Sequence, residues 1–134
     1  MVGQQDLALL LQWKKKQFLK FNEVLSVTEQ MVESMERNDK FSVSMLLSMR
    51  EDPVRQAQEI QDQIGEYLLQ MPEADAIRAN ELLTGTENGQ GMESALSNQV
   101  AQNRRLLDRI IRLDKFISQR LGGNRSFYAT FREG

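Results

Sequence analysis

The chain has 134 residues, with no cysteine and no histidine, and carries a net charge of −2 at pH 7. The lack of cysteine excludes disulfides and thiolate zinc sites, and the lack of histidine removes the commonest general base and metal ligand. Hydrophobic residues make up 40% of the chain, enough for one folded domain, but no run reaches the roughly 18 apolar residues of a membrane span. The start MVGQQDLALL lacks the pattern of a secretion signal, so we expect a soluble, cytoplasmic protein with no membrane span.

The charge is distributed unevenly along the chain. Residues 1–91 carry a net charge of −6, whereas residues 92–134 carry a net charge of +4. The two parts should attract each other, which suits helices that pack side by side. Neither part is basic enough to indicate nucleic-acid binding.

Apolar residues recur with a 4-3 spacing from Leu7 onward, which predicts one long amphipathic helix over about residues 5–36. Leu10, Val24 and Met31 widen this stripe on one side. The polar run over residues 37–39 predicts a turn. The stripe consists of Leu7, Leu11, Lys14, Phe18, Phe21, Leu25, Thr28, Val32 and Met35.

A second stripe starts at Val43 and predicts another long helix that ends at Met71, because the residue before Pro72 avoids the helical region. Pro53 lies inside this pattern, where proline costs about 3 kcal/mol. Because the register continues unshifted, we expect a kinked helix, with a break capped by Asp52 as the alternative. The stripe consists of Val43, Leu47, Arg50, Val54, Ala57, Gln61, Ile64, Leu68 and Met71, flanked by Leu46, Ile60 and Tyr67.

Residues 73–83 predict a short helix, residues 84–91 a glycine-containing loop, and residues 92–121 a last long helix that stops at two glycines. The sequence therefore predicts an all-α fold, an antiparallel up-down-up bundle of three long helices with one short helix in the second connection. Residues 1–121 would form the bundle domain and residues 122–134 an aromatic tail. The last stripe consists of Leu96, Val100, Asn103, Leu107, Ile110, Asp114, Ile117 and Leu121.

Three polar residues on the core stripes, Thr28, Arg50 and Asp114, fall at one level when the helices are aligned. We expect a polar layer with an Arg50–Asp114 ion pair, the alternative being that one or both side chains turn to solvent. Such a pair would fix the register of the helices more than it would stabilise them, because desolvation opposes the attraction.

The chain offers little for catalysis. A serine or cysteine nucleophile paired with histidine is impossible, and carboxylate pairs such as Glu59/Asp62 lie on polar helix faces. The glycine loop lacks the context of a phosphate-binding loop, and no metal-binding motif occurs. We therefore expect a protein that is not an enzyme and that needs no cofactor or metal.

Basic residues cluster at residues 14–16 and along a stripe of Arg105, Arg109 and Arg112. That stripe lies opposite the apolar face of its helix, where solvated charges belong, and no aromatic residue is interleaved with it for base stacking. We expect no nucleic-acid partner.

Apolar residues that fall at the edge of the stripes or off them are candidates for partner binding. These are Trp13, Val27 and Phe41, and seven methionines add adaptable surface. An amphipathic partner helix could use such a surface. The tail contributes three further candidates, Phe127, Tyr128 and Phe131, which either pack on the bundle or form a segment that orders on binding.

Three stretches together resemble the flagellar type III export chaperones, the FlgN-like group. They are LLLQWKKKQFLKFNEVLSVTEQMVESMERNDKFSVSMLLSMRE at residues 9–51, NRRLLDRIIRLDKFISQRLGG at residues 103–123 and SFYATFREG at residues 126–134. The match is one of spacing and residue type over most of the chain, and Pro53 and the loop at residues 84–91 depart from the family pattern.

The resemblance implies a cytosolic, non-catalytic chaperone. It would bind the C-terminal amphipathic helix of a hook-associated protein, prevent early assembly and deliver this export substrate to the export gate through the tail. Tyr128 matches the tyrosine with which that family docks at the gate. The main alternative is a coiled-coil adaptor that self-associates through the same heptads, for example as a homodimer.

Overall fold

The computed structural model describes residues 2–121, which form four α-helices and no strand within that range. The helices are α1 (Gln4–Glu36), α2 (Lys40–Leu69), α3 (Glu73–Thr84) and α4 (Met92–Leu121). The prediction of an all-α fold is confirmed. None of these helices is both long enough and apolar enough to cross a membrane. The predicted tail, with Phe127, Tyr128 and Phe131, lies outside the described residues.

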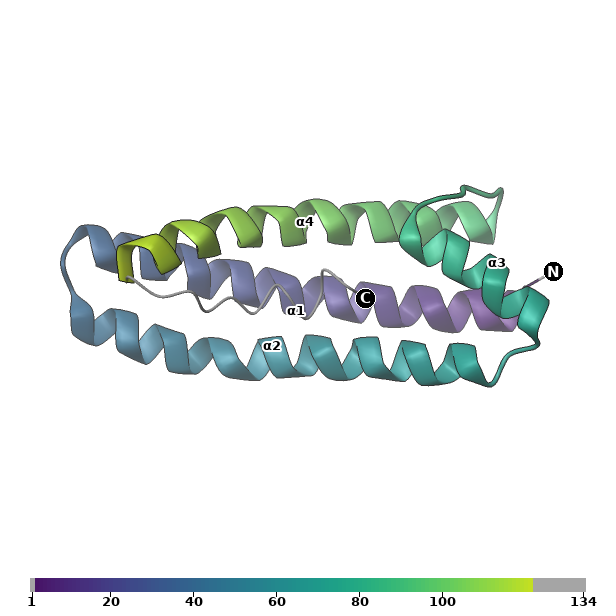
Figure 1. The fold of residues 1–134 in the computed structure, drawn as a ribbon, viewed down its shortest axis with the longest axis horizontal. Helices are drawn as coiled ribbons and strands as arrows, with labels where there is room; N and C mark the ends of the chain where they lie inside the picture. Colours follow the sequence, from purple (N-terminus) through teal and green to yellow (C-terminus); the bar gives the residue numbers. More distant parts are fainter. Residues whose placement is uncertain (1, 122–134) are drawn as a thin grey trace.

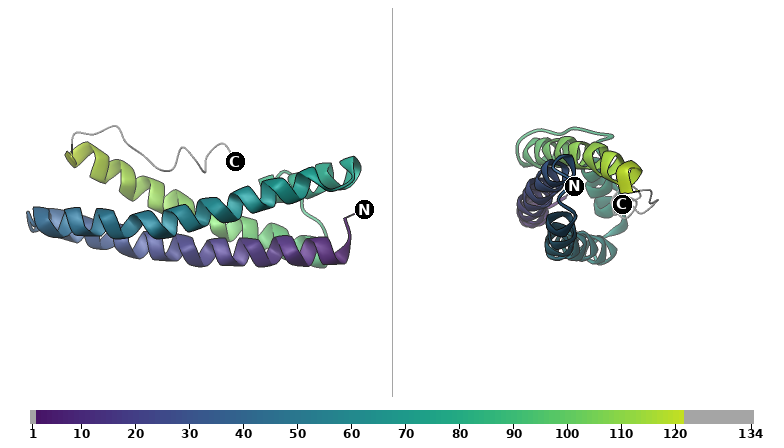
Figure 2. Two further views of the ribbon diagram at one scale, coloured as in Figure 1. Left: turned by 90° about the horizontal axis from the view of Figure 1, so that it is seen from below. Right: turned by 90° about the vertical axis from the view of Figure 1, so that its left-hand side faces the viewer.

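The long helices α1, α2 and α4 lie side by side, and α3 crosses between the end of α2 and the start of α4 (Figure 1). α2 and α4 each pack along α1, whereas their backbones make few contacts with one another. The end-on view in Figure 2 shows the three long helices in a triangular arrangement, with α2 and α4 on adjacent sides of α1. α1 is therefore the central helix of the fold.

Local sequence signals determine the turns between the helices. Asp39 caps α2, because its carboxylate accepts hydrogen bonds from the backbone N–H of Ser42 at 3.1 Å and from the Ser42 hydroxyl at 2.6 Å. α3 ends at Gly85, which has a φ of 78° in the left-handed region that glycine tolerates best. Arg78 of α3 pairs with Glu93 of α4 at 3.1 Å and holds the two helices together across the loop.

α2 is one helix that continues through Pro53, so the alternative of a break at Asp52 is wrong. Proline lacks the N–H that would bond to the carbonyl four residues earlier, and helix propensity alone would favour a break. Tertiary packing prevails here, because Pro53 is buried and lies on the same face of α2 as the buried Arg50, Ala57 and Ile60.

The buried face of α1 is rotated relative to the predicted stripe. Leu11 and Phe18 are only half-buried, whereas Leu10 and the polar Gln17 are buried. On α2, Leu47 is 47% exposed and Leu46 takes its place in the core. The reason is that α1 contacts two helices on adjacent sides, so the residues between those two contacts are the most enclosed.

The predicted ion pair between Arg50 and Asp114 is confirmed. Arg50 Nη2 donates to Asp114 Oδ1 at 2.6 Å, and the two side chains are only 8% and 6% exposed. Thr28 is fully buried and donates to the carbonyl of Val24 within its own helix. The pair joins α2 to α4 directly, although their backbones stay apart.

Breaking this pair should strongly destabilise the fold. We expect Arg50→Met or Asp114→Leu alone to lower the free energy of unfolding by about 3–5 kcal/mol, because each leaves an uncompensated buried charge. The double substitution should restore more than half of that loss, as measured by urea unfolding. Arg55→Met, which removes an exposed pair with Glu59, is the control and should change stability little. Additive losses in the double variant would contradict this account.

Candidate functional site

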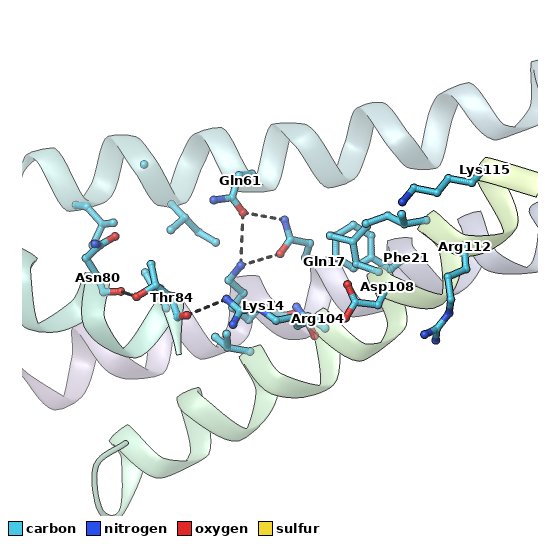
Figure 3. Close-up of a pocket in the computed structure, with 18 residues that line it drawn as sticks. Lys14, Gln17, Phe21, Gln61, Asn80, Thr84, Arg104, Asp108, Arg112 and Lys115 are labelled. Carbon is cyan, nitrogen blue, oxygen red and sulfur yellow. Dashed lines mark hydrogen bonds between the residues drawn. The ribbon is translucent and has the colours of Figure 1, made fainter. Parts of the chain in front are cut away.

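A groove runs between α2 and α4, with α1 as its floor and α3 beside one end (Figure 3). Its volume is about 880 Å³. The groove exists because α2 and α4 pack on α1 and not on each other. Its lining consists of Lys14, Gln17 and Phe21 of α1; Gln61, Ile64, Gly65 and Leu68 of α2; Asn80, Leu83 and Thr84 of α3; and Val100, Asn103, Arg104, Leu107, Asp108, Ile111, Arg112 and Lys115 of α4.

The lining combines apolar surface with an excess of positive charge. Seven of its side chains are large and apolar, and they come from all four helices. Lys14, Arg104, Arg112 and Lys115 are basic, and Asp108 is the one acidic residue of the lining. The groove therefore presents an apolar trough with a net positive charge, although residues 1–91 as a whole are acidic.

The floor of the groove contains a buried polar cluster centred on Lys14, which is only 9% exposed. Lys14 Nζ donates to Gln17 Oε1 at 2.9 Å and to Gln61 Oε1 at 3.4 Å. Gln17 Nε2 donates in turn to Gln61 Oε1 at 3.1 Å and to the carbonyl of Ala57 at 3.3 Å. These bonds connect α1 to α2.

The backbone of Lys14 also connects α1 to α4. Its carbonyl accepts a hydrogen bond from Asn103 Nδ2 at 2.9 Å. Asn103 Oδ1 accepts another from Gln99 Nε2, so the orientation of the asparagine amide is determined on both sides. One residue of α1 therefore contacts both walls of the groove.

A second cation, Arg104, lies near Lys14 on the other side of the floor (Figure 3). Arg104 Nη2 donates to the carbonyl of Thr84 at 2.8 Å, one of the carbonyls that the end of α3 leaves without a helical partner. Gly85 makes this approach possible, since a Cβ there would lie 3.1 Å from Arg104 Nη1.

These surroundings weaken the basicity of Lys14. Burial, and secondly the positive charge of Arg104, lower its pKa from 10.5 to about 8. No carboxylate in residues 2–121 pairs with Lys14 to offset these effects. At pH 7 the ammonium is therefore charged, buried and held only by amide oxygens.

The structure places the predicted partner-binding residues away from this groove. Trp13 is half-buried and packs edge to face on Tyr67, with ring centroids 5.4 Å apart. Val27 is half-buried against the core cluster that includes Met31. Phe41 is 78% exposed at the start of α2. The structure does not bring these three residues together.

The sequence did not predict the groove, because polar side chains at core positions do not by themselves indicate a binding site. The available signal was the presence of Lys14 and Gln61 on otherwise apolar stripes. It also missed Met45 and Met49, which are 49% and 55% exposed and continue the line of Phe41 at intervals of four residues.

Comparison of the chain with protein-family models, with curated proteins and with solved structures found no match. Within residues 2–121, no three acidic side chains gather where they could hold a metal ion. The groove is thus the feature on which a function for this protein can be argued.

Replacing Lys14 by methionine should stabilise the isolated protein at pH 7. The lowered pKa corresponds to about 3 kcal/mol of destabilisation by the buried charge, and losing the bonds to Gln17 and Gln61 offsets about 1 kcal/mol of this gain. We expect Lys14→Met to raise the free energy of unfolding by about 1–3 kcal/mol.

The pH dependence of this difference tests its cause. Below about pH 8, Lys14 is protonated in both the folded and the unfolded wild-type chain. Between about pH 8 and pH 10.5, Lys14 is protonated only in the unfolded chain. Wild-type stability should therefore rise towards that of Lys14→Met between these values in urea unfolding. Lys15→Met, on the exposed side of α1, is the control. A less stable Lys14→Met protein at pH 7 would contradict the argument.

Proposed function

We propose that this protein is a non-catalytic chaperone that holds an amphipathic helix of a partner protein in the groove between α2 and α4. The observation that carries this proposal is the groove itself, in which the apolar side chains of Leu68, Leu83, Leu107 and Ile111, from α2, α3 and α4, remain partly exposed. In this proposal the fold is an up-down-up bundle that is open along one side, and the partner helix takes the open position.

The dimensions of the groove suit a helix. Its lining on α4 runs from Val100 to Lys115, about 22 Å at 1.5 Å per residue. A volume of about 880 Å³ compares with roughly two turns of a helix about 10 Å wide. An amphipathic helix would place its apolar face on the trough and its polar face in solvent.

Gly65 supports close approach of a partner backbone. It lies in the last third of α2, in the groove lining, and nothing occupies the space within 4 Å of the position where a Cβ would stand. Glycine in a helix interior is destabilising by roughly 0.5–1 kcal/mol relative to alanine. A glycine that weakens its own helix and faces an open groove is consistent with a site where another chain packs closely.

The resemblance to flagellar type III export chaperones suggests the cargo. We propose that the partner is the C-terminal amphipathic helix of a hook-associated protein, held in the cytoplasm and delivered to the export gate. The tail at residues 122–134 would then dock at the gate through Tyr128, while the groove carries the cargo.

The substitution Gly65→Ala separates binding from stability. We expect it to raise the free energy of unfolding by about 0.5–1 kcal/mol, because alanine favours the helix. It should also weaken binding of the hook-associated helix about tenfold or more, because the methyl group stands where the partner backbone would pack. Urea unfolding and fluorescence anisotropy with a labelled peptide measure the two effects.

Gln63→Ala is the matched control, since Gln63 is exposed on the same helix and does not line the groove. It should leave peptide affinity unchanged. Equal affinity of Gly65→Ala and wild type would place the peptide elsewhere. If no hook-associated helix binds the wild-type protein at all, the flagellar assignment is wrong.

Tyr128→Ala tests the role of the tail in the full-length chain. We expect this variant to bind the cargo helix as tightly as the wild type and to lose association with export-gate components in co-purification. Phe131→Ala serves as a comparison for a general loss of aromatic surface. Loss of cargo binding in Tyr128→Ala would instead assign the tail to the cargo site.

A self-associating adaptor is the second candidate function, and the exposed line of Phe41, Met45 and Met49 favours it. A second copy of the chain could cover this line in a coiled coil. This function requires a melting temperature that rises with protein concentration and that becomes independent of concentration in Met45→Ser. A melting temperature independent of concentration in the wild type excludes it.

A further inference from the structure

We propose that Lys14 and Arg104 form a carboxylate-binding subsite on the groove floor, which selects partner helices with a glutamate or aspartate in the middle of their groove-facing side. This inference rests on the proposed function, because it concerns the helix that occupies the groove. It adds a specificity-determining contact that neither the apolar lining nor the shape of the groove supplies.

The first argument is the absence of a counter-charge. Neither Lys14 nor Arg104 forms an ion pair with a carboxylate in residues 2–121. Asp108 lines the same groove but pairs with neither cation within this part of the chain. Arg50 provides the contrast, because this equally buried cation is paired with Asp114. Buried charges in proteins are normally paired, so the unpaired lysine indicates a ligand that supplies the missing charge.

The second argument is the count of hydrogen-bond donors. An ammonium has three donors, and Lys14 uses two of them on Gln17 and Gln61, which leaves one. A guanidinium has five, and Arg104 uses one on the carbonyl of Thr84. The remaining donors belong to two cations that lie near each other on the adjacent helices α1 and α4 (Figure 3). A carboxylate has two oxygens and could accept from both cations at once.

The third argument concerns the carrier of the carboxylate. The groove that holds the cations also contains partly exposed apolar side chains, Leu68 and Leu83 from α2 and α3 and Leu107 and Ile111 from α4. A free anion would leave this apolar surface exposed to water. An acidic residue within the apolar face of a helix would cover the surface and neutralise the cations together.

The rigidity of the subsite fits a role in selection. Gln17 and Gln61 hold the ammonium from the side of α2, and the end of α3 holds the guanidinium through Thr84. The buried ammonium is thus positioned before any ligand arrives, and one hydrogen bond orients the exposed guanidinium, which reduces the ordering that binding requires. Glutamine at the same partner position would offer one neutral oxygen and would leave both charges uncompensated.

The test uses the full-length protein and three designed amphipathic peptides of about 20 residues that share one leucine-rich face. The first peptide has a glutamate in the middle of that face, the second has glutamine there, and the third has the glutamate moved to the polar face. Fluorescence anisotropy at pH 7 and physiological salt gives the affinities. We expect the first peptide to bind about tenfold or more tightly than the other two.

Protein variants then locate the effect. Lys14→Met should reduce the preference for the first peptide to about twofold or less, while binding of the glutamine peptide changes little. Arg104→Gln should reduce the preference in part. Lys15→Met and Arg105→Gln, which change exposed neighbours outside the groove lining, should retain the full preference. If Lys14→Met fails to fold, Arg104→Gln and Lys14→Gln carry the same comparison.

The outcomes separate this inference from the proposed function. Peptides that bind, and bind less well to Gly65→Ala, but show no preference for glutamate would overturn the subsite and leave the helix-binding function in place. Failure of all three peptides to bind would count against the function itself. If inorganic phosphate stabilises the wild type but not Lys14→Met, and glutamate gives no preference, the floor is a site for free anions and the inference is wrong.

Discussion

A single buried lysine on α1 connects the two walls of the groove. The ammonium of Lys14 bonds to Gln17 and Gln61 on the side of α2, while its backbone carbonyl accepts a bond from Asn103 of α4. The residue thereby contacts both α2 and α4 at a level where the backbones of those two helices make few contacts with each other. These contacts form the polar floor of the groove, and Lys14 contributes one of its four positive charges.

Two buried cations in the same bundle have different roles because one is paired and the other is not. The Arg50–Asp114 pair joins α2 to α4, so the charge of Arg50 is compensated within the bundle. Lys14 remains charged at pH 7 without a carboxylate in the described residues, at a cost in stability. Residues that lower stability at a proposed binding site are expected when the ligand provides the missing interaction.

The apolar groove and the line of Phe41, Met45 and Met49 are two separate uncovered surfaces. The groove is concave, contacts all four helices and carries a net positive charge, which suits a single amphipathic helix with acidic character. The methionine line is convex and lies on one helix, which suits a second helix alongside. The groove therefore offers the stronger basis for a specific partner, and the flagellar cargo is the proposal that the resemblance adds to it.

The sequence alone determined the features that depend on neighbouring residues. The heptad spacing, the polar turn at residues 37–39, Pro72 and the glycine-containing loop at residues 84–91 predicted approximately where helices begin and end. The levels of Arg50 and Asp114 predicted their pairing. Tertiary structure decided how each helix is rotated and how far apart α2 and α4 lie. Both depend on how side chains of three helices share the surface of α1, so Gln17 is buried in place of Phe18. For the same reason, the proximity of Lys14 and Arg104, ninety positions apart in the chain, appears in no local pattern.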